Sequence, residues 1–570
     1  MINYSAVSLN QLASNIIVEL LLQRGCDRFF ISPGSRSTPL TSAVAENERT
    51  HKIVHFDERG AAFAALGYAR ATGSAPVLIC TSGTAVANYF PAVVEASNDR
   101  LPLIVLSADR PPELQGVNAN QTIDQIDIYG PYPRSFINLE PPEESREYFT
   151  NLIGAINETI AQAKLNPTGP VHINCMFREP LAPLGELKDY SQLLSDLKFT
   201  TDAELTSTHE INFDEIRFSE NILLVVGYQK DLQHNEAILK FAEKYKLPLF
   251  ADSRSGLRTD HPNVISYFDQ ILLSENYNKL DKLSVIHFGG NLVSKRYLEF
   301  IERSEIVNYY HCDSEDYTYN PHHKTTQKIS APIDLILNAL DEKLSRNNGK
   351  LLAHFRKADE KIAQLLTDQI DNNTELSEIK IARVLSQNLT DENCLFLGSS
   401  MPVRDYDMFA DPVAAKIPLT ANRGASGIDG SIATALGFAI GHNKKGVALI
   451  GDLAFLHDLN SLALVKKSAQ PLLILVINND GGGIFSSLPV AECENLFEPY
   501  FGTPHGYSFK NSAEMFDLEY QMVETSESLK ECIKHFNENK QSLVVEIKSN
   551  RAENIKRHKE LAQLIKEELS

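Results

Sequence analysis

The sequence predicts an α/β protein made of three doubly wound domains with mainly parallel sheets. Apolar runs of strand length recur along the chain, and helical patterns separate them. Strands this continuously apolar, joined through helices, are typical of parallel sheets that are covered on both faces. The length agrees with several cores, because 570 residues are too many for a single one and 43% of them are hydrophobic.

The first domain is expected over residues 1–184, where strands and helices alternate. An amphipathic helix leads into the first strand, and an Ala-rich helix begins at Glu58. The predicted strands are 28–32, 52–57, 76–81 and 101–107. The predicted helices are 9–24, one that ends at 46, 58–72 and one that begins after the turn 82–84.

A smaller α/β domain is expected over residues 185–345, and the polar stretch 184–220 is predicted to be a linker leading into it. Its predicted strands are 222–227, 247–251 and 284–288. Residues 346–378 are charged and helical in pattern, with no strand of their own. They are therefore expected to form a helical linker.

The last domain is expected over residues 379–570, where the alternation of strand and helix resumes. Its predicted strands are 394–398, 446–450, 472–478 and 542–547. Its predicted helices include 430–441 and 458–467.

Charge, cysteine content and hydropathy exclude several classes of function. The formal net charge is −20, which argues against nucleic-acid binding because phosphate contacts need a concentrated basic surface. The seven cysteines are scattered without metal-ligand spacing, so they are predicted to be reduced thiols of a cytoplasmic protein. No apolar run approaches the roughly 18 residues of a membrane span, and no membrane insertion is expected.

The strongest chemical signal lies in the last domain. One buried strand ends in Gly451-Asp452, and the next ends in Asn478-Asn479 before a run of three glycines. The chain between them suits one helical crossover, so both side chains are expected at the carboxyl edge of the sheet, where open α/β folds bind ligands. Mg²⁺ prefers hard oxygen ligands, which Asp452, Asn479 and the Gly481 carbonyl would supply. The alternative is a strand-ending Asp that caps the next helix and an ordinary Asn-Asp-Gly turn.

Together with the segment Asp458-Leu459-Asn460, these residues resemble the diphosphate-binding motif of thiamine diphosphate enzymes. The resemblance implies a pyrimidine-binding, a middle and a diphosphate-binding domain in this order. It implies thiamine diphosphate and Mg²⁺ as cofactors, with Mn²⁺ as a possible substitute. The third residue of the motif is often Gly in the superfamily and is Leu453 here, which agrees with one subfamily.

That subfamily is the 2-succinyl-5-enolpyruvyl-6-hydroxy-3-cyclohexene-1-carboxylate synthases of menaquinone biosynthesis. The resemblance extends over both outer domains and touches the middle one at Ser294-Lys295-Arg296. Its other segments are Ile31-Ser-Pro-Gly-Ser-Arg-Ser-Thr-Pro-Leu40, His55-Phe-Asp-Glu-Arg-Gly60, Thr81-Ser-Gly-Thr-Ala-Val-Ala-Asn88, Ala108-Asp-Arg-Pro-Pro-Glu113, Ala119-Asn-Gln121, Asn422-Arg-Gly-Ala-Ser-Gly-Ile-Asp-Gly430 and Gly483-Ile-Phe485.

The resemblance assigns Glu58 to cofactor activation, because the matching glutamate hydrogen-bonds the aminopyrimidine ring. This role needs a carboxyl group that can share a proton. An apolar pocket provides one, because it disfavours the charged form of the group. The alternative is that Asp57 caps the helix and Glu58 merely suits its positive end. Ile428 resembles the bulky residue that keeps the cofactor bent, and its alternative is an ordinary core isoleucine.

The same resemblance assigns the remaining site residues. Catalysis is assigned to Glu58, Arg404 and Arg423, and the metal to Asp452, Asn479 and Gly481. Cofactor binding is assigned to Glu58, Ser82, Gly83, Ser426, Gly427, Ile428, Gly451, Asp452, Leu453, Asn479, Gly481, Gly482, Ile484 and Phe485. Substrate binding is assigned to Ser35, Arg36, Arg110, Asn120, Gln121, Lys295, Arg296, Arg404, Arg423, Ile484 and Phe485. Arginine suits anionic substrates because its planar fork binds carboxylates at two points, although any single arginine is more often a solvated surface residue.

The expected reaction is decarboxylation of 2-oxoglutarate and addition of the resulting four-carbon carbanion to isochorismate. The family also implies a homodimer or homotetramer with active sites between subunits. One alternative is another thiamine diphosphate enzyme, such as an acetolactate synthase or a 2-oxo acid decarboxylase, which would release CO₂ from pyruvate. The other is a non-catalytic α/β protein, which would not bind thiamine diphosphate.

Overall fold

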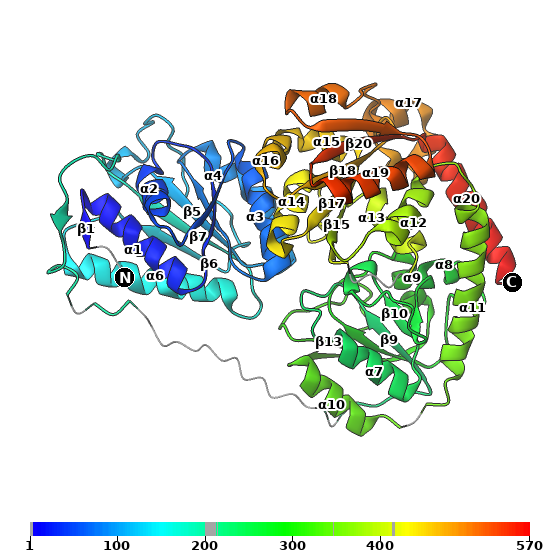
Figure 1. Ribbon diagram of the computed structural model, residues 1–570. Coiled ribbons are helices and arrows are strands. Elements are labelled where there is room, and N and C mark those ends of the chain that lie inside the picture. Colours follow the sequence, from blue (N-terminus) through cyan, green and yellow to red (C-terminus); the bar gives the residue numbers. More distant parts are fainter. Residues whose placement is uncertain (1–3, 196, 200–212, 214, 346, 413–416) are drawn as a thin grey trace. The chain divides into compact units, whose positions relative to one another are not determined.

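The computed structural model describes residues 4–195, 197–199, 213, 215–345, 347–412 and 417–570. It contains three six-stranded sheets, so the predicted α/β class is confirmed (Figure 1). The chain forms two compact units. The first unit holds the N-terminal sheet together with residues 422–446 and 457–472, and the second holds the middle sheet and nearly all of the C-terminal sheet.

The N-terminal sheet has the order β3-β2-β4-β5-β7-β6, and every neighbouring pair is parallel. Its strands are β2 (Arg28–Ile31), β3 (His51–Val54), β4 (Val77–Cys80), β5 (Leu103–Asp109), β6 (Ser135–Leu139) and β7 (Pro170–Met176). Its helices are α1 (Leu9–Gln23), α2 (Thr38–Glu46), α3 (Glu58–Thr72), α4 (Thr84–Asn88), α5 (Phe90–Asn98) and α6 (Arg146–Lys164). Helices α1, α2 and α6 share one core with the sheet, while α3 contacts its other face, as a doubly wound domain requires.

Most predicted elements of this domain are confirmed, and one is shorter than predicted. The predicted strand 52–57 ends at Val54. Asp57 instead caps helix α3, because its carboxylate accepts the backbone N–H groups of Arg59 and Gly60 at 3.0 and 3.4 Å. Strands β6 and β7 were not predicted.

The middle sheet has the order β11-β10-β9-β12-β13-β14 and is also parallel throughout. Its strands are β9 (Asn221–Val226), β10 (Leu249–Ala251), β11 (Val264–Ile265), β12 (Leu283–Phe288), β13 (Ile306–Asp313) and β14 (Gln327–Ser330). Its helices are α7 (Asn235–Tyr245), α8 (Phe268–Ile271), α9 (Lys295–Arg303) and α10 (Ile333–Lys343).

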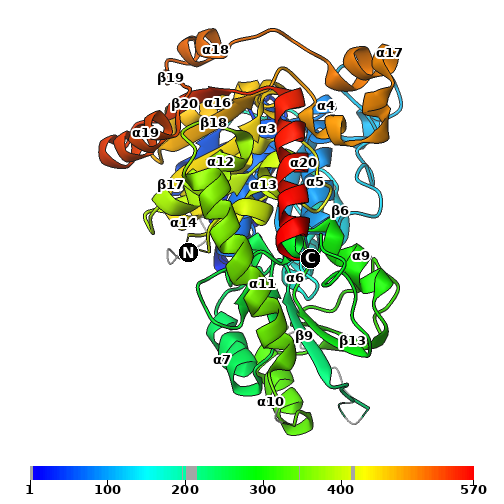
Figure 2. The same cartoon turned by 90° about the vertical axis from the view of Figure 1, so that its right-hand side faces the viewer.

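The two predicted linkers are only partly described. In the first, residues 196, 200–212 and 214 lie outside the described residues, and β8 (Lys188–Asp189) pairs antiparallel with β1 (Ser5–Ala6). In the second, residue 346 lies outside them. Residues 350–371 are helical, with α11 (Lys350–Leu366) as the main element, whereas residues 373–377 are not helical and Glu375 forms a β-bridge with Thr525. Helix α11 runs beside the last helix, α20 (Arg551–Glu568), as both views show (Figures 1 and 2).

The C-terminal sheet has the order β16-β15-β17-β18-β20-β19. Its strands are β15 (Asn393–Leu397), β16 (Leu419–Thr420), β17 (Lys445–Gly451), β18 (Leu472–Asn478), β19 (Glu519–Val523) and β20 (Leu543–Lys548). The helices include α12 (Glu378–Asn388), α13 (Met401–Phe409), α14 (Ser431–His442), α15 (Asp452–His457), α16 (Leu462–Lys467), α17 (Glu494–Phe497), α18 (Lys510–Met515) and α19 (Ser526–Asn539).

One predicted helix of this region, 458–467, needs a correction. A 3₁₀ turn occupies Leu459–Ser461, and α16 begins only at Leu462. The Asp458 carboxylate explains the difference. It accepts the Ser461 hydroxyl at 2.7 Å and the Ala433 backbone N–H at 2.9 Å, so it ties the turn to helix α14.

Helices α3 and α14 of the first unit pack backbone against backbone. A Cβ on Gly67 would lie 2.1 Å from the Thr434 carbonyl oxygen, and one on Gly437 would lie 1.9 Å from that of Ala64. Only glycine allows this approach. The helix that begins at Glu58 and the helix that follows Ile428 are therefore in close contact.

None of the helices described is both long and apolar enough to span a bilayer. All seven cysteines are free thiols, and Cys493 is the exposed one.

Candidate active site

Strands β17 and β18 are neighbours in the C-terminal sheet, as the sequence predicted. Asp452 follows the end of β17 and Asn479 follows the end of β18, so both lie at the same edge of the sheet. The Asp452 carboxylate accepts the Gly481 N–H at 2.9 Å and the Leu453 N–H at 2.7 Å. We call the edge formed by Asp452, Asn479 and Gly481 the metal edge.

The Asn479 side chain is held from one side only. Its Nδ2 donates to Glu378 Oε1 at 3.0 Å, whereas its buried Oδ1 has no hydrogen-bond partner among the described residues. A buried amide oxygen without a partner is costly in an isolated protein. A cation is a natural partner for it.

The glycines at the metal edge leave no room for side chains. A Cβ on Gly481, which has a φ of +128°, would lie 1.9 Å from the Gly502 carbonyl oxygen. A Cβ on Gly482 would lie 2.2 Å from the Phe501 carbonyl oxygen, and one on Gly483 would lie 2.6 Å from Asn479 Nδ2. By contrast, a Cβ on Gly451 would meet no atom within 4 Å. The backbone is therefore open to a ligand at Gly451 and tightly packed along the 481–483 loop.

The predicted cofactor residues Ile484 and Phe485 continue this loop in a 3₁₀ turn, Gly483–Ser487. The Phe485 ring packs edge-on against Phe501 with their centroids 5.7 Å apart. The turn is thus held by the same 501–502 segment that packs against Gly481 and Gly482.

The donor set of the metal edge suits a hard divalent cation. The described residues contain no cluster of three or more His, Cys, Asp or Glu side chains arranged for a metal. The edge instead offers a carboxylate, an amide oxygen and a backbone carbonyl, which fits Mg²⁺ because this ion keeps few protein ligands and completes its shell with phosphate oxygens. Burial raises the pKa of the Asp452 carboxyl group, while the N–H groups of Gly481 and Leu453 oppose the shift. A bound cation would favour the ionised form further.

His505 is a further residue at this edge. Its Nε2 lies 3.2 Å from Asp452 Oδ2 but without hydrogen-bond geometry. The backbone N–H of His505 donates to Asp480 Oδ1 at 2.8 Å, which fixes the position of its loop.

Glu58 is the first residue of helix α3 and is half-buried. Burial raises the pKa of its carboxyl group, and the nearby Asp57 adds to the shift. Burial raises the pKa values of the Cys80 thiol and the Tyr89 hydroxyl, and the Glu58 carboxylate lies near enough to add to both shifts. Apart from its own backbone N–H, no group of the described chain holds the Glu58 side chain by a hydrogen bond, so it is available to a ligand.

Ile428 is not a core residue, because 37% of it is exposed. It lies in the loop before helix α14, where Ser426 has a φ of +61° and Gly430 a φ of +56°. A Cβ on Gly430 would lie 2.0 Å from the Phe63 side chain of helix α3. The prediction that Ile428 is more than an ordinary core isoleucine is consistent with this exposure.

Several predicted substrate residues lie together at the carboxyl edge of the N-terminal sheet. Arg110 donates to Ser82 Oγ at 3.0 Å and to the Asn120 carbonyl at 3.2 Å. Gln121 Nε2 donates to the Ser82 carbonyl at 3.0 Å. A Cβ on Gly83 would lie 2.9 Å from the Gln121 side chain, so the turn 82–84 and the 120–121 loop are in contact.

Arg36 joins this cluster through the turn that carries Ser35. Its backbone N–H donates to Thr81 Oγ1 at 3.2 Å, and its guanidinium donates to the Phe177 carbonyl at 2.9 Å and pairs with Glu179 at 3.4 Å. Burial and the charge of Arg110 lower the pKa of Arg36. Two arginines close enough to repel each other favour an anionic ligand between them.

The loop that carries Arg423, Ser426 and Gly427 is clamped by a residue that the sequence analysis missed. Glu95 of helix α5 is buried, and its carboxylate accepts the N–H groups of Gly424 at 2.9 Å and Ala425 at 2.6 Å. Arg70 pairs with Glu95 at 2.6 Å. No motif marks Glu95, because it lies on the helix α5 and not next to the loop in sequence.

The remaining predicted substrate residues lie in the second unit. Arg404 donates to the Ser399 and Ser400 carbonyls at 2.8 and 2.6 Å. Lys295 is 88% exposed, and Arg296 forms an ion pair with Asp269. The structure does not bring Lys295 and Arg296 to the metal edge by any described contact.

Two buried residues that no sequence motif marked, Gln125 and Asn174, support the predicted site residues through hydrogen bonds. The buried Gln125 accepts the Gly83 N–H at 3.0 Å and donates to Asn174 at 2.8 Å, and Asn174 donates to Asp109 at 3.0 Å. This chain of hydrogen bonds supports the turns that carry Ser82 and Arg110.

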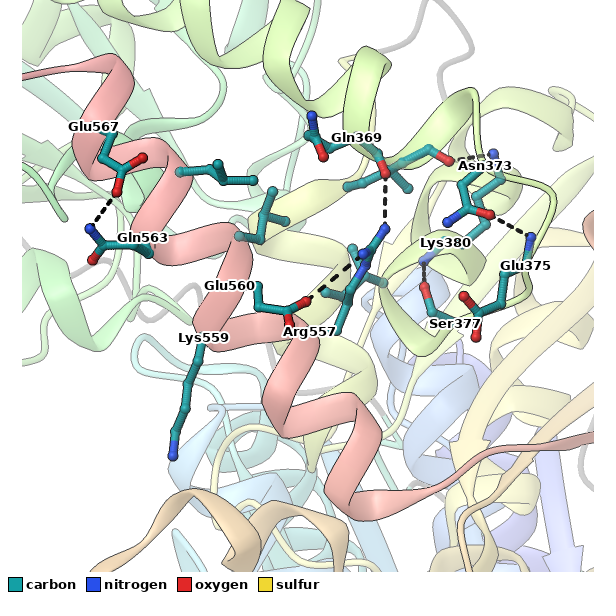
Figure 3. Close-up of a pocket in the computed structure, with 14 residues that line it drawn as sticks. Gln369, Asn373, Glu375, Ser377, Lys380, Arg557, Lys559, Glu560, Gln563 and Glu567 are labelled. Carbon is teal, nitrogen blue, oxygen red and sulfur yellow. Dashed lines mark hydrogen bonds and ion pairs between the residues drawn. The ribbon is translucent and has the colours of Figure 1, made fainter.

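Two pockets of the second unit do not coincide with the metal edge. One, of about 580 Å³, lies between residues 369–377, which follow α11, the start of α12 and helix α20, where Arg557 donates to the Gln369 carbonyl at 3.1 Å (Figure 3). The other, of about 620 Å³, is lined by Arg296 and Arg303. Neither is lined by Asp452, Asn479 or Gly481.

Comparison with known families identifies the class of protein. Residues 12–128 match the N-terminal TPP binding domain of thiamine pyrophosphate enzymes, pyrophosphate being another name for diphosphate. Residues 189–397 match the middle domain of thiamine pyrophosphate, and residues 415–547 match the C-terminal TPP binding domain. The fold and the three matched domains are thus those of a thiamine diphosphate enzyme.

Similar proteins narrow the class further. Proteins named 2-succinyl-5-enolpyruvyl-6-hydroxy-3-cyclohexene-1-carboxylate synthase are 40% identical in Pelodictyon phaeoclathratiforme, over 97% of this chain and 95% of the relative, and 38% identical in Rubrobacter xylanophilus, over 97% and 98%. The chain belongs to this family of synthases. Among solved structures, the thiamine diphosphate-dependent 4-hydroxybenzoylformate decarboxylase of Rhodococcus jostii RHA1 has a similar fold, with a TM-score of 0.69, 16% identity and coverage of 94% of this chain and 99% of that one.

Proposed function

We propose that the protein is a thiamine diphosphate-dependent transferase that decarboxylates 2-oxoglutarate and adds the remaining four-carbon unit to isochorismate. The products are 2-succinyl-5-enolpyruvyl-6-hydroxy-3-cyclohexene-1-carboxylate and CO₂, in a step of menaquinone biosynthesis. The observation that carries the proposal is the 38–40% identity to synthases of this name over nearly the whole chain.

Thiamine diphosphate, when bound, supplies stabilisation of the carbanion that forms when CO₂ leaves. In the proposal, Glu58 hydrogen-bonds the aminopyrimidine ring and holds a proton there. Its raised pKa supports this role, because the group keeps a proton more readily than an exposed glutamate does. Ile428, exposed in its loop, would supply an apolar contact to the bound cofactor.

Asp452, Asn479 and the Gly481 carbonyl would hold Mg²⁺, or Mn²⁺ in its place, against the diphosphate. The partnerless Oδ1 of Asn479 supports this assignment. Gly451 and Leu453 would contribute backbone contacts, since the open space at Gly451 lets a phosphate approach closely. The tightly packed 481–483 loop would hold the Gly481 carbonyl and the Gly482 backbone in place.

The arginines would orient the two anionic substrates. Arg36 and Arg110 lie on one edge of the first unit, and their guanidinium groups could bind a carboxylate at two points. We assign Arg404 and Arg423 to the reacting substrates as well, with Ser35, Asn120, Gln121, Lys295 and Arg296 as further substrate contacts. Orientation by fixed charges lowers the cost of bringing two anions together.

We further propose a cytoplasmic homodimer or homotetramer with active sites between subunits. In such an assembly Glu58 of one copy and Asp452 of another would meet at one cofactor. The exposed apolar side chains of Val54 and Phe56 beside Glu58 support a covered surface there, since they are 50% and 58% exposed.

The proposed domain bounds are 1–184 for the pyrimidine-binding domain, 185–345 for the middle domain and 379–570 for the diphosphate-binding domain. Residues 346–378 form the proposed helical linker. Helix α11 supports this division, because it packs against both α8 and α20.

Product analysis tests the proposed function directly. The protein is mixed with thiamine diphosphate, Mg²⁺, 2-oxoglutarate and isochorismate, and the products are separated by mass. The expected result is the succinyl-cyclohexene carboxylate together with CO₂. Release of CO₂ from pyruvate alone, with no product from the expected pair, would instead identify a decarboxylase or an acetolactate synthase.

A further inference from the structure

A buried glutamate stands behind the metal edge. Glu378 is the first residue of helix α12, is 2% exposed and lies far from Asn479 in the sequence. Its Oε1 accepts two hydrogen bonds, one from Asn479 Nδ2 at 3.0 Å and one from Ser549 Oγ at 2.8 Å. The carboxyl group thus connects α12 with the ends of β18 and β20.

The contact decides which way the Asn479 amide faces. A carboxylate oxygen only accepts hydrogen bonds, so the amide must present its NH₂ group to Glu378. Its Oδ1 then faces away, and this is the buried oxygen that has no partner among the described residues. A flipped amide would bring two acceptors together at Glu378 and would turn two N–H groups toward the place of the cation.

The charges around Glu378 act on its protonation and not on the orientation of Asn479. The negative charge of Asp405 lies close enough to Glu378 to act on its pKa, and His558 pairs with Asp405 at 3.2 Å. Burial, reinforced by Asp405, raises the pKa of Glu378 to about 7. Oε1 accepts both hydrogen bonds whether or not the other oxygen carries a proton, so the orientation of Asn479 holds in either state.

We infer that Glu378 is a positioning residue for the metal site, which fixes the Asn479 amide so that its oxygen, and not its nitrogen, faces the cation. This inference rests on the proposed metal site. Outer partners of metal ligands commonly act in this way, and their loss costs about 10- to 100-fold in metal affinity.

The alternative is that Glu378 only stabilises the fold, since an acidic residue in the first turn of a helix is favourable in any case. A purely structural role predicts a lower melting temperature with unchanged metal affinity in the folded protein. A positioning role predicts a loss of metal affinity that a residue with a side-chain carbonyl at position 378 can rescue.

The test measures Mn²⁺ binding to the full chain by electron paramagnetic resonance in the presence of thiamine diphosphate. We expect Glu378→Leu to weaken Mn²⁺ binding by about 10- to 100-fold. Glu378→Gln should stay within about threefold of the wild type, because the glutamine carbonyl accepts the same two hydrogen bonds. Ser549→Ala is the matched control, because it removes the other donor to the same oxygen and should leave Mn²⁺ binding unchanged.

Glu378→Asp extends the test if the leucine variant does not fold. Its carboxylate is withdrawn by one methylene, so an intermediate loss of Mn²⁺ affinity is expected. Wild-type affinity in a folded Glu378→Leu or Glu378→Asp protein would overturn the inference, and so would a Glu378→Gln protein as weak as the leucine variant. Failure of the wild-type protein to bind Mn²⁺ with thiamine diphosphate would instead overturn the proposed metal site itself, for which Asp452→Ala serves as the reference.

Discussion

The carboxyl groups at the metal edge and at the start of helix α3 differ in how they are hydrogen-bonded. At the metal edge, Asp452 is held by two backbone N–H groups, and the neighbouring amide of Asn479 is held by Glu378. At the start of α3, Asp57 takes the capping bonds, and Glu58 has no hydrogen bond from another residue of the described chain. Burial raises the pKa of both Asp452 and Glu58, so the contrast lies in how the two side chains are held. The first arrangement suits a ligand that must stay in place, and the second suits a group that must exchange a proton.

Removing the Asp452 carboxylate should have the largest effect on cofactor binding and turnover. In Asp452→Ala we expect no measurable retention of Mg²⁺ and thiamine diphosphate, and a fall in kcat of at least about 10³-fold, because the metal loses its charged ligand. Calorimetry with the cofactor and steady-state kinetics check this. Asp480→Asn is the control, since its side-chain oxygen can still accept the His505 and Gly506 N–H groups at 2.8 and 2.7 Å. Wild-type cofactor retention in the alanine variant would remove Asp452 from the site.

Replacing the Glu58 carboxyl group with a neutral amide should lower turnover and leave the binding of thiamine diphosphate nearly unchanged. In Glu58→Gln we expect kcat to fall by about 10²- to 10⁴-fold, as is usual for the loss of a group that transfers protons. The Kd for thiamine diphosphate should change only a few-fold, because the amide fills the same space. If kcat and Kd worsened together, Glu58 would be a binding residue like Asp452, and the contrast between the two regions would disappear.

The arginines near the second region should act on substrate binding. In Arg110→Lys we expect KM for one of the two acids to rise by about 10-fold, with a smaller change in kcat, because lysine cannot bind a carboxylate at two points. Arg178→Lys is the matched control, since Arg178 is half exposed and pairs with Glu113 at 2.8 Å. Equal KM values in both variants would place Arg110 outside the substrate site.

The smallest effect concerns a third carboxyl group, which is held like Asp452 but has no proposed ligand. Burial raises the pKa of Asp458 from 3.8 to about 6. The folded chain therefore binds this proton more tightly than the unfolded chain, and wild-type stability falls as the pH rises from about 4 to 6. An amide at this position does not titrate, so in Asp458→Asn this loss, roughly 3 kcal/mol, should be absent.

Melting temperatures between pH 4.5 and 7 check this last prediction. The difference between Asp458→Asn and the wild type should grow by a few degrees over that range. Asparagine can keep both contacts, because its Oδ1 can accept the Ala433 N–H and its Nδ2 can donate to the Ser461 hydroxyl. If the difference in melting temperature stayed constant with pH, the Asp458 carboxyl group would have an ordinary pKa.

The sequence predicted that Asp452 and Asn479 lie at one sheet edge, but it did not predict the residues that support them. Asp452 and Asn479 follow buried strands, and the ends of neighbouring parallel strands meet at one edge whatever lies around them. Glu378, Glu95 and Gln125 act from elements that are remote in the chain, and none carries a motif. Their roles depend on packing between elements, which periodicity does not reveal.

The same reason explains the elements that were missed or misjudged. Buried strands such as β9 and β18 were predicted because their apolar runs are continuous. The edge strand β19 is mostly exposed and shows no such run. At residues 458–461 a side chain, Asp458, bonds to the backbone of another helix, and this tertiary bond replaces the expected helical turn.

The glycine contact between α3 and α14 bears on attempts to engineer a hardier protein. Replacing a helical glycine with alanine ordinarily stabilises a helix by about 1 kcal/mol. At Gly67 or Gly437 the added methyl group would collide with a carbonyl oxygen of the facing helix. The methyl group would push the two helices apart and shift Glu58 and the Ile428 loop with respect to each other. A substitution that ordinarily raises thermal stability would therefore lower activity at these two positions.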